Sequence, residues 1–153
     1  MENGSKDFYS LISEITKMEA EYEELDEERK HLEYLLYNFG KDNSNKLYTL
    51  ANDIRTKKYL IDDITKKISE IELDSTMKSY YDLYKEKSVL VKKYWNLKAE
   101  AGYIDSAFIF GNSGDENSNN KTMVKRKELG EKQISIESEI KVIDIKMNIL
   151  HTS

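Results

Sequence analysis

Residues 8–39 read FYSLISEITKMEAEYEELDEERKHLEYLLYNF, and their apolar side chains recur with a seven-residue spacing. One register of the repeat holds Phe8, Tyr22 and Leu36, and its complement holds Leu11, Met18, Leu25, Leu32 and Phe39. Because residues three and four positions apart share one face of an α-helix, the two registers form a single apolar seam. The stretch therefore predicts a long helix that packs against other helices.

The boundaries of this first helix follow from the residues around it. Ser5 is a good N-cap and Gly40 is a typical C-terminal stop, so we expect the helix to run between them. The polar run 41–45 then predicts a short turn that sends the chain back antiparallel. A second seam comprises Leu47, Leu50, Ile54, Ile61, Ile64, Ile68 and Ile71, with Lys57 as a polar residue within it.

A third seam is offset from the second, and the register changes near residues 73–76. It comprises Tyr80, Leu83, Leu90, Tyr94, Leu97, Ala101, Ile104 and Phe108. Either a turn with Asp74 or Ser75 as N-cap separates two helices, or one helix continues through residues 45–105 with a stutter. We favour the turn, because it gives four helices of matched length, and the absence of proline is compatible with helices throughout.

Three regions are expected along the chain. Residues 1–110 form a helical hairpin or three-helix coiled-coil region, and residues 111–121, which contain no apolar side chain, form a flexible polar linker. Residues 122–153 form a C-terminal helix that packs on the same bundle or on a partner. The predicted fold is all-α: an elongated antiparallel helical bundle, or helical hairpins with coiled-coil seams.

The C-terminal helix carries apolar side chains on two opposite faces. One face holds Leu129, Ile136, Ile140, Ile143, Met147 and Leu150, and the other holds Ile134, Val142, Ile145 and Ile149. One groove cannot bury both faces of a helix, since they lie about half a turn apart. The sequence leaves open whether the second face is internal core or an interface with another molecule.

Composition argues against catalysis and metal binding. The 153 residues include no cysteine and only two histidines, His31 and His151, which are far apart in the sequence. Thiolate chemistry is thereby excluded and a zinc site is not expected, and no Glu-x-x-His pair lies on an apolar seam. We predict no catalytic residue, no cofactor and no metal. Neither a signal peptide nor a membrane span is visible, so an intracellular location in the nucleus or cytoplasm is expected.

Charge argues against nucleic-acid binding as the main activity. The net charge is -5, whereas phosphate contacts call for a positive surface. Direct contact with nucleic acid is not expected, and the best candidates for making one are Lys125, Arg126 and Lys127.

These patterns predict a non-catalytic structural or adaptor subunit of a multiprotein complex. It would bind other helical proteins, as a hetero- or homo-oligomer, through helix–helix packing. The residues expected to contact a partner are Ile134, Val142, Ile145 and Ile149, followed by Phe108 and Phe110. An alternative is a peripheral adaptor that binds a nucleic-acid or membrane surface through basic helix faces. A small metal-binding helical enzyme is the third reading.

Overall fold

Four helices make up the described part of the chain. The computed structural model describes residues 2–111 and 116–152, with side chains from residue 7 onward. The helices are α1 (Glu2–Phe39), α2 (Ser44–Ser69), α3 (Ser75–Phe110) and α4 (Glu116–Thr152), and no strand occurs within the described ranges. The predicted all-α fold with antiparallel helices is confirmed.

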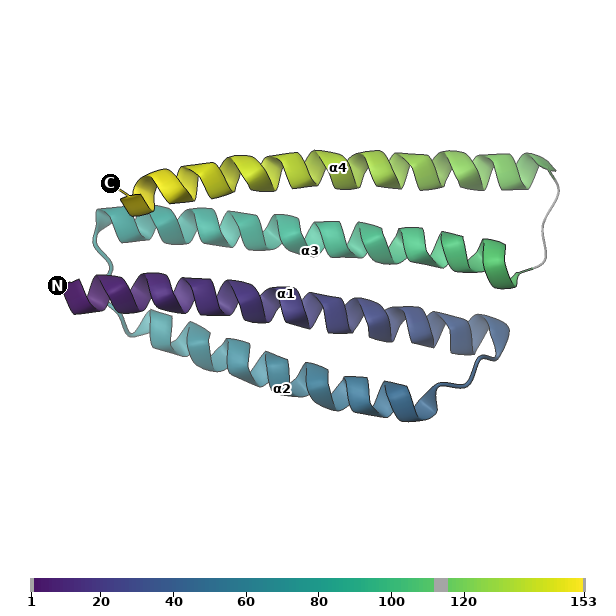
Figure 1. The fold of residues 1–153 in the computed structure, drawn as a ribbon, viewed down its shortest axis with the longest axis horizontal. Coiled ribbons are helices and arrows are strands. Elements are labelled where there is room, and N and C mark those ends of the chain that lie inside the picture. Colours follow the sequence, from purple (N-terminus) through teal and green to yellow (C-terminus); the bar gives the residue numbers. More distant parts are fainter. Residues whose placement is uncertain (1, 112–115, 153) are drawn as a thin grey trace.

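The helices lie side by side in the order α2, α1, α3, α4, so that the chain forms an open layer (Figure 1). Helix α1 contacts α2 on one side and α3 on the other, and α4 contacts α3. In the described ranges α2 and α4 do not contact each other, and the layer is therefore not closed into a ring. This leaves α2 and α4 as its two edges.

Two of the predicted turns are formed by local hydrogen bonds. Gly40 ends α1 with a positive φ of 64°, and its N–H donates to the Leu36 carbonyl at 3.0 Å. Between α2 and α3, the Asp74 carboxylate accepts a hydrogen bond from the Met77 N–H at 2.8 Å. The favoured turn is therefore confirmed, and residues 45–105 belong to two helices.

The predicted starts of the first and last helices were wrong. Helix α1 begins at Glu2, so Ser5 lies inside the helix and is not its N-cap. Helix α4 begins at Glu116, and residues 116–121 of the expected linker are helical. Residues 112–115 of that linker lie outside the described residues. Both differences extend a helix through polar residues that carry no seam signal.

The buried side chains form two groups separated along the layer. The group at the end that holds both termini comprises Phe8, Ile12, Ile15, Ile64, Ile68, Met77, Tyr84, Ile143 and Met147, from all four helices. Towards the opposite end lie the buried residues Leu32, Leu35, Leu50, Ala99, Ala101, Ser106 and Leu129. Between them, no described side chain is buried in residues 16–31, 51–63, 85–98 and 130–142. We call these four segments the polar middle section, although half-buried apolar residues of it, such as Met18, Ile61 and Leu90, pack against the first group.

Candidate interaction surface

The residues predicted on the second face of the last helix are exposed. Ile134, Val142, Ile145 and Ile149 retain 65%, 50%, 61% and 59% of their accessible surface, and we call these four residues the outer face of α4. On the opposite side of the helix, Leu129, Ile143 and Met147 are buried. The second face is thus not part of this chain's own core.

The edge position of α4 explains this exposure. Helix α4 packs along α3, which covers one side of it, and near its C-terminal end His151 also stacks on Tyr9 of α1. A helix packed on one neighbour buries one stripe, and the remaining stripe faces outward. Val142, Ile145 and Ile149 follow one another at helical spacing and Ile134 lies about two turns before them, so the four give α4 an exposed apolar stripe.

Phe108 and Phe110 lie elsewhere, at the end of the layer where α3 finishes and α4 begins. A groove of about 500 Å³ is lined there by Phe108, Met123, Arg126, Lys127 and Gly130. Ile109, Met123 and Val124 are also exposed at this end, although they were not among the residues predicted to contact a partner. The structure thus brings Phe108 close to Arg126 and Lys127, but places both phenylalanines apart from Val142 and Ile145.

The basic run at this end is partly neutralised. The Arg126 Nε donates to Asp105 Oδ1 at 3.0 Å, whereas Lys125 and Lys127 are exposed. Lys41 also places its Nζ 5.0 Å from the centroid of the Phe110 ring. The end groove therefore combines an apolar floor with a cationic rim.

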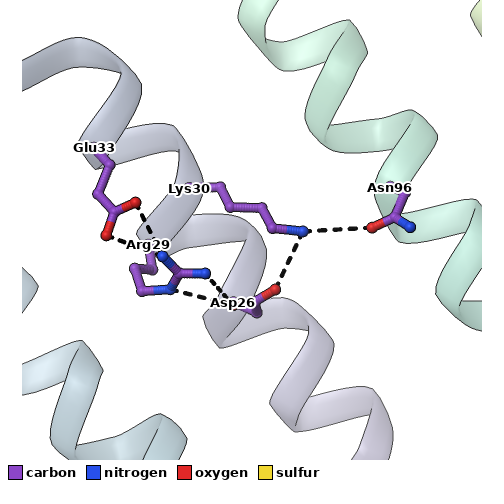
Figure 2. Close-up of polar contacts among 5 residues, drawn as sticks. All are labelled: Asp26, Arg29, Lys30, Glu33 and Asn96. Carbon is purple, nitrogen blue, oxygen red and sulfur yellow. Dashed lines mark hydrogen bonds and ion pairs between the residues drawn. The ribbon is translucent and has the colours of Figure 1, made fainter. Parts of the chain in front are cut away.

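A charged network occupies the middle of α1 and faces α3. Figure 2 shows Arg29 between two carboxylates: it donates to Asp26 Oδ1 at 2.7 Å and to Glu33 Oε1 at 2.9 Å. Lys30 lies 3.2 Å from Asp26 Oδ2 and donates to Asn96 of α3 at 3.4 Å. Burial raises the pKa of Asp26, but the hydrogen bonds from Arg29 and Lys30 outweigh it and hold that pKa below its ordinary value. The charges satisfy one another within α1, and the hydrogen bond from Lys30 to Asn96 links the network to α3.

Lys57, the polar residue in the second seam, pairs across to α1. Its Nζ donates to Glu21 Oε2 and lies 3.8 Å from the sulfur of Met18. The hydrogen bond from Lys57 lowers the pKa of Glu21. Lys46 makes a further ion pair with Glu28 at 3.0 Å. The basic residues of α2 therefore dock on the acidic α1, as expected for oppositely charged neighbours.

Tyr84 is a buried aromatic residue at the border of the polar middle section. Its buried hydroxyl donates to Glu19 Oε1. Burial raises the pKa of Tyr84 far above the ordinary tyrosine value, and the hydrogen bond to Glu19 adds to the effect. The folded structure therefore favours the neutral, protonated form of the Tyr84 side chain.

We expect the folded chain to lose stability in alkali through Tyr84. Because its pKa is raised on folding, the unfolded chain releases the proton first, and the free energy of unfolding falls as pH rises above about 10. Tyr84→Phe should cost about 1–2 kcal/mol at pH 7 but show a shallower decline above pH 10. Urea unfolding at several pH values measures both. Tyr48→Phe, an exposed tyrosine, serves as control, and equal slopes in all three proteins would contradict the prediction.

Both histidines contact other side chains of the described helices. His31 Nδ1 lies 3.5 Å from Ser106 Oγ, but Ser106 is only 3% exposed, so a substrate could not reach that hydroxyl. His151 instead stacks on Tyr9, with ring centroids 4.2 Å apart. Across residues 7–111 and 116–152, no three His, Cys, Asp or Glu side chains are placed to share a metal ion.

None of the described helices is both long enough and apolar enough to cross a lipid bilayer. The fold and the surface define an antiparallel four-helix layer with an exposed apolar ridge on an edge helix. Comparison with protein-family models, with curated proteins and with solved structures finds no match.

Proposed function

We propose that this chain is a non-catalytic structural or adaptor subunit that binds helical partners through the outer face of α4. The observation that carries the proposal is the exposure of Ile134, Val142 and Ile145 on one stripe of an edge helix. Helix pairing would bury this stripe, and each side chain removed from water would contribute favourably in proportion to its apolar area. Flanking charges would set the orientation and choice of partner.

The accessible area of the chain supports the same proposal. It is 10303 Å². A compact monomer of 18.0 kDa is expected to expose about 8,000 Å². The excess, roughly 2,000 Å², exceeds the roughly 800 Å² that each partner contributes to a standard interface. An open layer of long helices thus keeps enough surface for a further helix to pack on.

The substitution Ile145→Glu is expected to abolish association while leaving the chain helical. The charge would sit at the centre of a dry interface but is solvated in the separate chain. Light-scattering mass across a dilution series measures association, and circular dichroism measures helicity. Lys132→Glu is the control, because it places a glutamate at an exposed position of α4 about 120° around the helix from the centre of the outer face.

The same pair of variants tests a heteromeric partner. Proteins retained by the wild-type chain and by Lys132→Glu in affinity purification from the native source should be lost with Ile145→Glu. If Ile145→Glu associates and retains partners as the wild type does, the proposal is wrong. If it unfolds, the outer face belongs to the core and the proposal is equally wrong.

The end groove supports a second candidate function, in which the chain is an adaptor that binds an anionic surface of nucleic acid or membrane. Phe108 and Met123 would supply apolar contacts and Lys125 and Lys127 the positive charge. Binding of that kind weakens steeply with salt, whereas helix packing through isoleucine does not. Association that disappears between low and high ionic strength would therefore favour the second candidate over the first.

A further inference from the structure

One side of α1 is charged where the α1–α2 hairpin packs on the α3–α4 hairpin. At 100° per residue, four charged residues fall within about 60° of one another: Glu19, Glu23, Asp26 and Lys30. Glu19 accepts a hydrogen bond from Tyr84 of α3, and Lys30 donates one to Asn96 of α3 (Figure 2). These four residues, which we call the charged line of α1, therefore face α3.

Glu23 differs from the other carboxylates of the charged line in having no direct partner. The Asp26 carboxylate accepts a hydrogen bond from Arg29 and pairs with Lys30. Glu23 is half-buried as well, yet no described residue donates a hydrogen bond to its carboxylate or forms a direct ion pair with it. A carboxylate that loses part of its hydration without gaining hydrogen bonds is held in an unfavourable charged form.

The charged groups that act on Glu23 all lie on α1 and α3. Burial raises the pKa of Glu23, and repulsion by Asp26 and Glu19 of α1 adds to the effect. Attraction by Lys92 of α3 and by Lys30 of α1 lowers this pKa but does not outweigh the burial. The surroundings of Glu23 therefore favour its neutral form, in contrast to those of Asp26.

We propose that Glu23 is a proton-dependent switch between the two hairpins: when its carboxyl group takes up a proton in mildly acidic solution, α1 packs more tightly against α3. The neutral group no longer repels Asp26 and Glu19, and its burial between the helices costs less free energy. The switch does not involve the outer face of α4. Its failure would therefore leave the proposed function standing, and the reverse also holds.

The direction of the pH dependence follows from the two carboxylates. Because folding raises the pKa of Glu23, its contribution to stability is fully present below the pKa of an unfolded glutamate, about 4.3. It is lost as the pH rises through the higher pKa of the folded chain. Asp26 has the opposite dependence, and its contribution is lost only as the pH falls below about 3.9. In mild acid, Glu23 therefore titrates while Asp26 stays charged.

NMR of the side-chain carboxyl carbons tests the proton site in the wild-type chain. Glu23 should titrate at a higher pH than Glu24, the adjacent exposed glutamate. The variant Lys92→Met removes one of the positive charges that lower the pKa of Glu23, so the titration midpoint of Glu23 should move further upward. A Glu23 midpoint at or below that of Glu24, or a downward shift in Lys92→Met, would overturn the proposal.

Hydrogen exchange tests whether this proton acts on the contact between the helices. In the wild-type chain, the protection factors of backbone amides in residues 16–31 and 85–98 should rise severalfold as the pH falls from about 7.5 to about 5. Glu23→Gln imitates the protonated carboxyl group, so its protection factors should be higher than wild type at the upper pH and should rise less. Glu24→Gln is the matched control and should follow the wild type. Equal pH dependence in Glu23→Gln and the wild type would contradict the switch.

Discussion

Replacing Phe8 with alanine is expected to lower the free energy of unfolding by about 3–5 kcal/mol. Phe8 has 0% exposure and belongs to the buried group to which all four helices contribute. Its ring lies edge-on to Tyr80 and Tyr81, with centroids 6.1 Å away in both cases. Helices α1, α2 and α3 all line this region, so they cannot readily collapse into the space that the ring leaves.

Urea unfolding followed by circular dichroism measures this loss. Tyr37→Ala is the control, since this aromatic residue of the same helix is exposed and its truncation should stay within about 0.5 kcal/mol. Similar losses for both variants would contradict the packing of the first two turns of α1 against the rest of the layer.

A second pair of substitutions compares the two faces of α4. Ile143 is 5% exposed and Ile145 is 61% exposed, although they are only two residues apart. Ile143→Ala should therefore cost about 2–5 kcal/mol. Ile145→Ala should stay within about 0.5 kcal/mol in the separate chain. The difference arises because Ile143 packs against the core group, whereas Ile145 faces away from α3.

Both variants should be unfolded with urea at a protein concentration below that of self-association, so that the interface does not contribute. At high protein concentration, association should raise the free energy of unfolding, because binding of the folded state stabilises it by mass action. The increase should be larger for Ile143→Ala than for Ile145→Ala. Equal losses at low concentration would show that α4 is covered on both faces.

Much of this fold could be predicted because helix periodicity and turn residues act locally. The seam in residues 8–39 predicted α1, Gly40 predicted its end, and the change of register near Asp74 predicted the break between α2 and α3. Ile134 and Val142 were predicted to lie opposite the main stripe of the last helix, and their exposure agrees with that geometry.

The order of the helices could not be predicted from the same pattern. A seam shows which side of a helix is apolar, but not which neighbour covers it, so the edge position of α4 emerged only from the fold. The polar middle section was also missed. Tyr22 and Leu25 continue the repeat in α1, yet they are only half-buried. Tyr22 lies near the charges of Asp26, Arg29 and Lys30, and Leu25 lines a groove with Glu21 and Glu28 of α1 and Lys57 of α2. Ser5 and residues 116–121 were misplaced because helices can extend through polar residues when no proline stops them.

The polar middle section has a mechanical consequence. Close-packed side chains resist deformation, whereas ion pairs on flexible stems tolerate small sliding movements. We therefore expect the middle of the layer to deform more readily than its two buried ends. Glu131, Ile134 and Val142 of α4 lie within this section, so we expect the edge helix to adjust its curvature to a helix that packs on it while both ends keep their packing.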